Sequence, residues 1–188
     1  MASSGAGLER RRGENLVYNV ENARIIYEGL KDAGIGLIAS VPDSWNRELR
    51  RFVAGDSEII YVPCTREDQA VAVAMGGFLG GKKSAVIMEG SGYGLCAGVL
   101  ARPGFVQRMP VLILSSHTAT MGEMTDSHSE SKYLCEPVLR ALNIPHYLLM
   151  DIGQAKLVIR EAQATIEGQL IPFAILLPRH ILWRVMGQ

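Results

Sequence analysis

Cysteine, net charge and long hydrophobic runs are all scarce in this chain of 188 residues. Its three cysteines are an odd number at wide spacing without a C-x-x-C pair, which argues against a disulfide framework, a zinc site and a redox motif. The formal net charge is zero, from 19 basic and 19 acidic residues, so no overall attraction favours nucleic acid or an anionic membrane. We expect three reduced, mostly buried thiols and neither of these two partners.

The apolar segments are short. The longest, residues 111–114 and 173–177, fall far below the roughly 20 residues that span a bilayer, so we expect no transmembrane segment. Residues 1–13 are rich in Ser, Gly, Glu and Arg and contain no apolar stretch of the kind found in secretory signals. We therefore expect a disordered tail over residues 1–13, a single domain over residues 14–188, and a cytoplasmic protein.

Short runs rich in β-branched residues alternate with longer segments of helical period along the rest of the chain. This alternation predicts an α/β fold: a single domain with a six-stranded parallel sheet flanked by helices on both faces. The expected strands cover residues 36–41, 58–62, 85–88, 111–114, 146–149 and 173–177. The expected helices cover residues 20–33, 44–53, 67–79, 95–102, 130–142 and 153–167.

Polar segments follow several of the expected strands. Because open parallel sheets bind ligands beyond the carboxyl ends of their strands, these segments are where we look for a site. They cover residues 41–45, 63–69, 89–94 and 115–129.

Glu67 stands at the start of an expected helix. A carboxylate in the first turn is explained by the helix dipole alone, which it stabilises by about 0.3–1 kcal/mol. The small residues that follow favour a functional interpretation, because they fit a helix pressed against another backbone at a subunit interface. These residues are Ala70, Ala72, Ala74, Gly76 and Gly77.

A glycine-rich segment, residues 89–97, follows a strand and opens a helix. Its second half matches the relaxed G-x-G-x-x-A pattern of dinucleotide sites. A nicotinamide site is disfavoured, because the segment follows the third expected strand and no acidic residue stands at the end of the next one. Close approach of this backbone to another ligand stays open.

The loop over residues 115–130 concentrates His117, Glu123, Asp126, His128 and Glu130, and it is too long for a simple connection. Its spacing matches no established metal-ligand pattern. One interpretation makes His128 a proton-transfer group or a donor to an anionic substrate, because histidine titrates near neutrality. The alternative is a solvated loop in which a serine caps the following helix.

Four segments stand in a fixed order: Arg-Glu-Asp-Gln-Ala at 66–70 leading to Gly-Gly at 76–77, Gly-Gly-Lys-Lys at 80–83, Ala-Val-Ile-Met-Glu-Gly-Ser-Gly at 85–92, and Arg-Met-Pro-Val-Leu-Ile-Leu-Ser at 108–115. Together they resemble the pyrimidine-binding (Pyr) domain of thiamine-diphosphate enzymes. Ser-Val-Pro-Asp-Ser-Trp at 40–45 and Asp-Ser-His at 126–128 resemble the sulfopyruvate and phosphonopyruvate decarboxylases within that superfamily. A free-standing domain of this size is similar to the alpha subunits of sulfopyruvate decarboxylases.

The resemblance implies roles for several of these residues. The Glu67 carboxyl would hydrogen-bond the N1′ atom of the cofactor's aminopyrimidine and favour its imino tautomer. Asp43 and His128 would be the polar pair that relays protons. The remaining residues implied to contact the cofactor are Pro42, Gly90, Ser91 and Gly92.

The implied reaction is decarboxylation of a 2-oxo acid, with 3-sulfopyruvate giving sulfoacetaldehyde and CO2 in coenzyme M formation. Candidate partners for the anionic substrate are His117, Arg108 and Lys132. The alternatives within the superfamily are a phosphonopyruvate decarboxylase or an acetolactate-synthase-like carboligase. Outside it, a non-catalytic Pyr-like binding module and a flavodoxin-type nucleotide-binding domain stay open.

Two departures from the superfamily qualify these expectations. The chain contains no Gly-Asp-Gly followed by the Asn that holds Mg2+ and the diphosphate, so we expect no metal ligand in this chain. The resemblance therefore implies a separate beta subunit with the diphosphate-binding (PP) domain, in a hetero-oligomer of alpha/beta pairs. Glu89 stands where relatives carry a small or uncharged residue, and a carboxylate there would oppose an anionic substrate unless an ion pair neutralises it.

Overall fold

The computed structural model describes residues 9–11, 14–118, 123 and 126–185. Its centre is a six-stranded sheet in the order β4-β3-β5-β6-β8-β7, in which every neighbouring pair is parallel. All six strands overlap the segments expected from the sequence, so the α/β prediction is confirmed, and the strand expected at 111–114 continues to His117, into the expected loop. Their bounds are β3 Leu37–Ser40, β4 Ile60–Pro63, β5 Ser84–Glu89, β6 Leu112–His117, β7 His146–Leu148 and β8 Phe173–Pro178.

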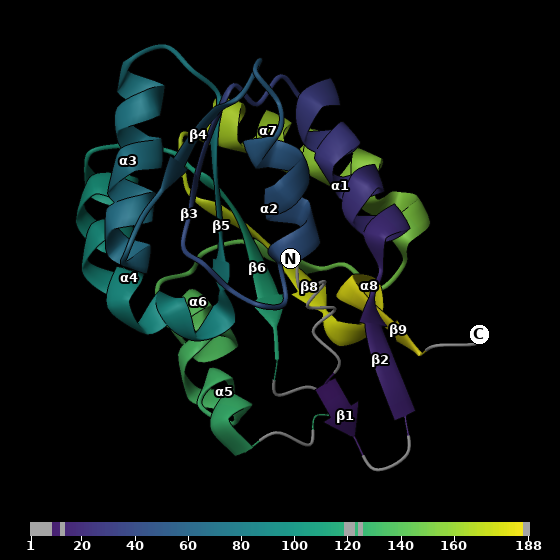
Figure 1. Cartoon of the computed structure of the whole chain (residues 1–188). Helices are drawn as coiled ribbons and strands as arrows, with labels where there is room; N and C mark the ends of the chain where they lie inside the picture. Colours follow the sequence, from purple (N-terminus) through teal and green to yellow (C-terminus); the bar gives the residue numbers. More distant parts are fainter. Residues whose placement is uncertain (1–8, 12–13, 119–122, 124–125, 186–188) are drawn as a thin grey trace.

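Helices cover both faces of the sheet, in two groups on opposite sides (Figure 1). One group packs into a core cluster with Ile38 and Ile87, and the other into a cluster with Ala39 and Met88. Alternate residues of each strand thus enter opposite cores, which explains why these strands read as continuous apolar runs. The first group is α1 Val20–Asp32, α2 Arg47–Ala54 and α7 Ala155–Gln169, and the second is α3 Glu67–Leu79, α4 Tyr93–Val99 and α6 Glu136–Ala141.

Two expected helices differ from their predicted course. The helix expected over residues 130–142 is divided at Cys135 into α5 Ser131–Leu134 and α6. Pro137 accounts for the break, because it lacks the N–H that would bond to the carbonyl four positions earlier. The helix expected over residues 95–102 starts at Tyr93 and continues as a π-helix over Leu100–Val106. Short 3-10 turns complete the helical elements: η1 Gly90–Gly92, η3 Asp126–His128 and η4 Ile152–Gln154.

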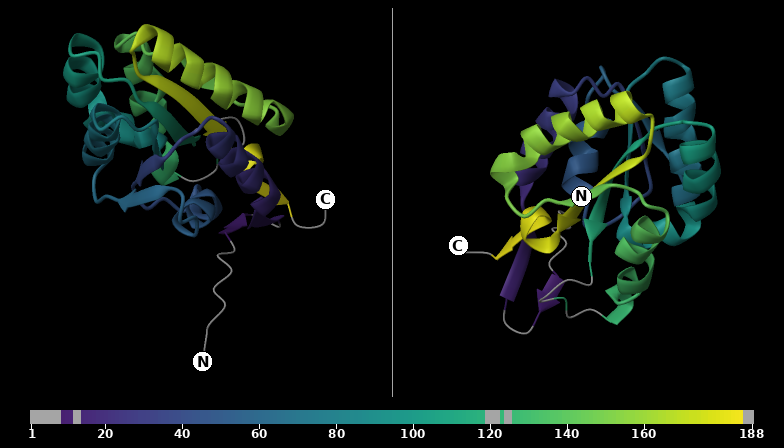
Figure 2. Two further views of the ribbon diagram at one scale, coloured as in Figure 1. Left: turned by 90° about the horizontal axis from the view of Figure 1, so that it is seen from above. Right: turned by 180° about the vertical axis from the view of Figure 1, so that it is seen from behind.

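A second, antiparallel sheet that the sequence did not predict joins the two ends of the described chain (Figure 2). It consists of β1 Glu9–Arg11, β2 Glu14–Tyr18 and β9 Trp183–Val185, with α8 Arg179–Leu182 leading into β9. The rings of Tyr18 and Trp183 lie 4.2 Å apart across β2 and β9. Strand β1 lies inside the segment expected to be a disordered tail, and the rest of that tail, residues 1–8 and 12–13, lies outside the described part of the chain.

The three cysteines are free and buried, as expected. Burial raises the pKa of Cys96 and of Cys135 to about 12. Among the described residues, no helix combines the length and apolar character needed to cross a membrane.

Candidate active site

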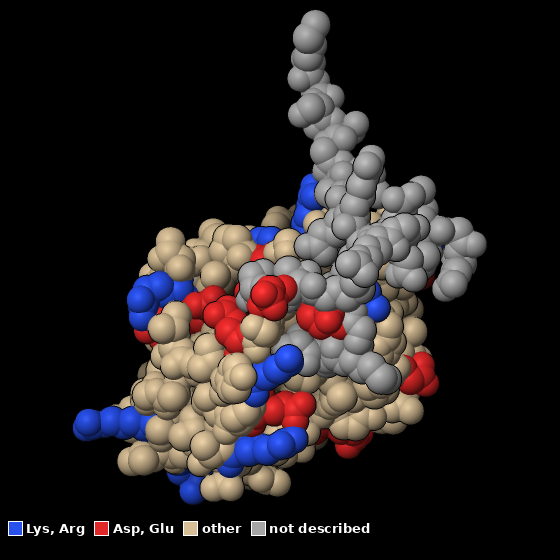
Figure 3. Space-filling view, turned by 90° about the horizontal axis from the view of Figure 1, so that it is seen from below, with Lys and Arg blue, Asp and Glu red and all other residues tan. Residues whose placement is uncertain are grey.

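Several of the expected site residues follow or end strands at the carboxyl edge of the parallel sheet, which lies at the bottom of Figure 1. Asp43 follows β3, Glu67 starts α3 after β4, and Glu89 ends β5. In the view onto this edge, acidic side chains lie near the middle of the face, and most of the Lys and Arg side chains lie toward its rim (Figure 3). Strand topology therefore brings together carboxylates that are up to 46 positions apart in the sequence.

Asp43 is held by three hydrogen-bond donors. Its Oδ1 accepts from the backbone N–H of Trp45 at 3.0 Å, and its Oδ2 accepts from Asn46 Nδ2 at 2.7 Å and Ser116 Oγ at 3.0 Å. Burial nevertheless raises the pKa of Asp43, because desolvation disfavours the charged form more strongly than these bonds and Arg50 favour it. A buried carboxyl group with a raised pKa takes up a proton more readily than an exposed one, which suits it to proton transfer.

Glu67 is the first residue of α3, and its side chain lies against the η1 turn. A Cβ on Gly92 would run into Cγ of Glu67 and would lie 3.0 Å from its Cβ and Cδ. Gly90 is similarly constrained, because a Cβ there would lie 2.6 Å from the carbonyl oxygen of Ser116. Packing within this chain thus accounts for two glycines that the sequence had marked as cofactor contacts.

Glu89 lies in the electrostatic field of the other site residues. Its pKa is raised chiefly by burial, and further by the charges of Asp43, Glu130 and Glu67, while His128 opposes the increase. These interactions place all four groups around Glu89. The carboxyl edge therefore gathers several carboxyl groups, and burial beside them disfavours the charged form of Glu89.

His128 lies in η3, with its Nδ1 3.3 Å from Oε2 of Glu123. Its ring packs edge-on against Trp45, with 5.6 Å between ring centroids, and Trp45 packs in turn against Trp183 at 6.3 Å. Trp45 follows Asp43 by two positions, so one short segment supplies both the carboxyl and the surface on which the imidazole rests.

His117 is placed differently from its expected role as a substrate contact. It is buried, its Nε2 lies 3.1 Å from Oε1 of Glu136, and Glu136 also pairs with Arg140. Burial lowers the pKa of His117 despite the neighbouring carboxylate. A neutral imidazole already bonded to Glu136 offers no positive charge to an anion.

The two basic candidates for contact with the substrate, Arg108 and Lys132, lie in different parts of the fold. Arg108 precedes β6 at the amino edge of the sheet, opposite the carboxylates, and donates to the Gln169 carbonyl oxygen at 3.3 Å. Lys132 lies exposed on α5, four positions after His128. Of the other expected contacts, Pro42 is exposed and Ser91 is half-buried on the carboxyl edge. Within this chain, Lys132 is thus compatible with the site and Arg108 is remote from it.

Asn46 and Ser116 are site residues that the sequence analysis missed. Both are fully buried, and both donate to Asp43. A signal existed for Ser116, because Ser115 and Ser116 directly follow the apolar run at 111–114. Nothing in the sequence indicated which of the two points toward Asp43.

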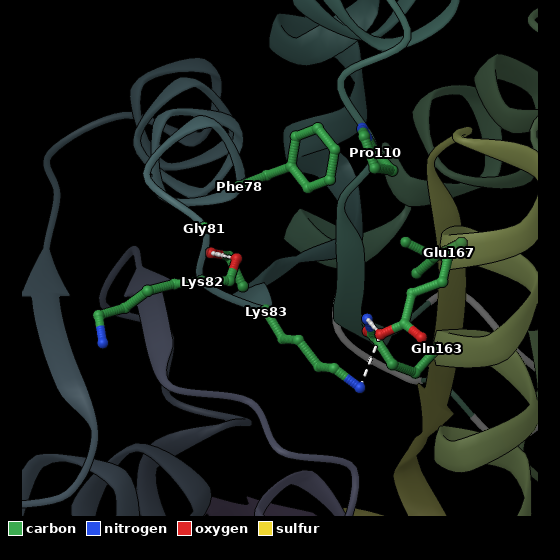
Figure 4. Close-up of a pocket in the computed structure, with 9 residues that line it drawn as sticks. Phe78, Gly81, Lys82, Lys83, Pro110, Gln163 and Glu167 are labelled. Atoms are coloured by element: carbon green, nitrogen blue, oxygen red, sulfur yellow. Dashed lines mark hydrogen bonds and ion pairs between the residues drawn. The ribbon is translucent and has the colours of Figure 1, made fainter.

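A separate pocket opens at the amino edge of the sheet, among Phe78, Ser84, Pro110 and Gln163 (Figure 4). At its side, the Lys83 Nζ lies 2.7 Å from Oε1 of Glu167. Its position at the starts of β5 and β6 separates it from the carboxylates by the length of the strands. Among the described residues, no group of three His, Cys, Asp or Glu side chains is arranged to hold a metal ion.

No protein-family model matches the chain. The chain is 35% identical over 126 residues to the alpha subunit of sulfopyruvate decarboxylase from Methanothermobacter thermautotrophicus, covering 67% of this chain and 76% of that one. It is 30% identical over 151 residues to the corresponding subunit from Methanocaldococcus jannaschii, covering 80% and 89%. It is also 29% identical over 159 residues to the phosphonopyruvate decarboxylase of Streptomyces hygroscopicus, covering 82% of this chain and 39% of that one.

Solved structures share the fold. A 2-oxoglutarate:ferredoxin oxidoreductase from Magnetococcus marinus matches with a TM-score of 0.67 and 13% identity, over 96% of this chain and 32% of that one. A thiamine-diphosphate-dependent 4-hydroxybenzoylformate decarboxylase from Rhodococcus jostii matches with a TM-score of 0.63 and 16% identity, over 86% and 30%. The chain thus spans about a third of each of these structures. On the sequence relationships, the chain belongs to the family of sulfopyruvate decarboxylase alpha subunits.

Proposed function

We propose that this chain is the Pyr subunit of a thiamine-diphosphate-dependent decarboxylase that converts 3-sulfopyruvate to sulfoacetaldehyde and CO2. The observation that carries the proposal is the placement of Glu67 against Gly92, at a sheet edge where Asp43 and His128 also converge. The family relationship supplies the reaction and the substrate.

The residues of this edge fit the aminopyrimidine half of the cofactor. Glu67 would hydrogen-bond the ring nitrogen, and the η1 backbone, kept free of a Cβ at Gly92, fixes where its carboxyl lies. When bound, thiamine diphosphate supplies a carbon nucleophile and an acceptor for the electrons released with CO2.

Asp43 and His128 would transfer the protons that the reaction needs. Replacement of the carboxylate of 3-sulfopyruvate by hydrogen consumes one proton for each CO2 released, and that proton must reach a carbon atom. The Asp43 carboxyl, whose pKa is raised by burial, would bind and release this proton. His128, which rests on Trp45, lies on the same edge and would complete the relay.

The diphosphate half of the cofactor does not fit this edge. Asp43, Glu67 and Glu130 all act on Glu89 there, and a cluster of acidic groups disfavours a diphosphate. We therefore assign Mg2+ and the diphosphate to a complementary PP-domain beta subunit, in a hetero-oligomer of alpha/beta pairs. Lys132 is the candidate from this chain for the anionic group of the substrate.

A second candidate substrate is phosphonopyruvate, because a phosphonopyruvate decarboxylase is among the relatives. Both substrates carry an anionic group on C3 of a 2-oxo acid, so the same catalytic residues serve either one. Retention of Glu67 argues against a non-catalytic binding module.

The test uses the complex purified from its natural source, supplied with Mg2+ and thiamine diphosphate. CO2 release from 3-sulfopyruvate and from phosphonopyruvate is compared, and we expect a higher kcat/KM for 3-sulfopyruvate. Glu67→Gln in the reconstituted complex should lower kcat by about 10²–10⁴-fold, whereas Glu161→Gln on the exposed face of α7 should leave it unchanged. Normal turnover by Glu67→Gln would refute the assignment.

A further inference from the structure

We propose that Asn46 and Ser116 are positioning residues: they hold Oδ2 of the Asp43 carboxyl and leave Oδ1 as the oxygen that exchanges the proton. The inference rests on the proposed function, in which Asp43 transfers a proton during decarboxylation.

The hydrogen bonds of the carboxyl are divided unequally between its two oxygens. Oδ2 accepts from both Asn46 Nδ2 and Ser116 Oγ, and Oδ1 accepts only from the Trp45 N–H among the described donors. Each carboxyl oxygen has two in-plane lone pairs. Those of Oδ2 are therefore both engaged, and one lone pair of Oδ1 is left for a proton.

Asn46 is placed at a cost to stability. Its side chain is fully buried, and its Oδ1 has no hydrogen-bond partner within the described part of the chain. A buried polar oxygen without a partner destabilises the folded state. Its Nδ2, however, donates to Asp43 and to the carbonyl oxygen of Met88 at 3.0 Å, so the amide ties the carboxyl to the end of β5. An apolar side chain of similar volume would pack there without providing this link.

Ser116 is the second donor to Oδ2 of Asp43, and it comes from β6. Its neighbour Ser115 is equally buried but points to the other face of the strand, where its Oγ lies 3.2 Å from the hydroxyl of Tyr93. The two serines thus share strand, burial and chemistry and differ in whether they reach Asp43. They form a matched pair of test and control.

The charges around Asp43 set the direction of the expected effect. Arg50 of α2 and the donors Ser116 and Asn46 lower the pKa of Asp43, and burial raises it. Glu89 of β5 is the neighbouring carboxylate, and the two disfavour each other's charge. Loss of a donor to Oδ2 therefore raises the pKa of Asp43 further.

The experiment compares Ser116→Ala and Ser115→Ala in the assembled alpha/beta enzyme, through the pH dependence of kcat and of KM. In the pH profile of kcat, one limb reports the ionisation of Asp43. For Ser116→Ala we expect the midpoint of this limb to shift to higher pH by about 0.5–1 pH unit. We also expect kcat to fall about threefold to tenfold with KM within about twofold. Ser115→Ala should keep the original limb, and Asn46→Ala should move it in the same direction as Ser116→Ala. Identical pH limbs in all three variants and the unaltered enzyme would overturn the proposal.

Asp43→Asn separates this inference from the proposed function. If Asp43→Asn decarboxylates 3-sulfopyruvate normally, the role of Asp43 itself is wrong. If Asp43→Asn is inactive while the serine and asparagine variants leave the pH limb in place, Asp43 is required and the positioning role is wrong.

Discussion

Gly92 packs so closely on Glu67 that a Cβ at position 92 would collide with the glutamate side chain. The turn after β5 therefore fixes the carboxyl that starts α3, across 25 positions of sequence. Because catalysis depends on placement of reacting groups to within about an ångström, this contact links a backbone feature directly to the proposed chemistry.

Gly92→Ala is expected to lower kcat by about tenfold to a hundredfold, because the added methyl displaces Glu67. Gly98→Ala is the control: Gly98 lies in α4, and its Cβ would meet nothing within 4 Å. That change should leave kcat unaltered and stabilise the protein by roughly 0.5–1 kcal/mol, since alanine favours the helix. Steady-state kinetics of both variants in the assembled enzyme test this prediction. Equal kcat in the two variants would show that Gly92 does not fix the position of Glu67.

Glu89→Gln should raise the Tm at neutral pH by about 2–4 °C. The carboxylate of Glu89 is disfavoured by burial and by Asp43, Glu130 and Glu67, and the amide removes this charge. A raised folded-state pKa means that stability from Glu89 declines as pH rises through the interval above its ordinary value of 4.5. The gain should therefore vanish below about pH 4, where Glu89 is protonated in both states. Thermal unfolding at pH 4 and pH 7 measures it; a gain equal at both pH values would exclude the electrostatic cause.

His117 should make the protein less stable in mild acid. Its pKa is lowered by burial in the folded state, so the unfolded chain takes up a proton first as pH falls through about 6.5. Stability contributed by the neutral ring is thus lost below that pH. In urea unfolding between pH 7 and pH 5, His117→Gln should show a smaller decline than the unaltered chain. A decline of the same size in both would assign the loss to other groups.

Leu114→Ala should destabilise the fold by about 2–5 kcal/mol, because Leu114 is fully buried in the central strand β6 and its removal leaves a cavity. Leu157→Ala offers the control, since Leu157 is 50% exposed on α7 and its truncation should cost much less. Denaturant unfolding of both variants gives the comparison. A similar loss in the two would show that burial in this core is not what stabilises β6.

The main sheet could be predicted from the sequence because its strands are buried on both faces and therefore form apolar runs, as in residues 85–88 and 111–114. The small sheet could not be predicted. Strands β1 and β9 have three residues each, too few for a periodic pattern, and β9 reaches β2 only through α8, from the other end of the described chain. The break at Cys135 was missed because the apolar period continues across it, although Pro137 interrupts the backbone bonding.

The residue types of the site were determined by the sequence alone: a carboxylate after β3, another at the start of α3 and a histidine in the polar loop, in an order that resembled the family to which the chain belongs. Only the tertiary structure decided how those groups are used. In the folded chain, Ser116 donates a hydrogen bond to Asp43 across 73 positions of sequence, and burial lowers the pKa of His117. Arg108 lies at the opposite edge of the sheet. Sequence periodicity tells which residues are buried, whereas hydrogen bonds and pKa values depend on distances between elements, and these are set by packing and strand register.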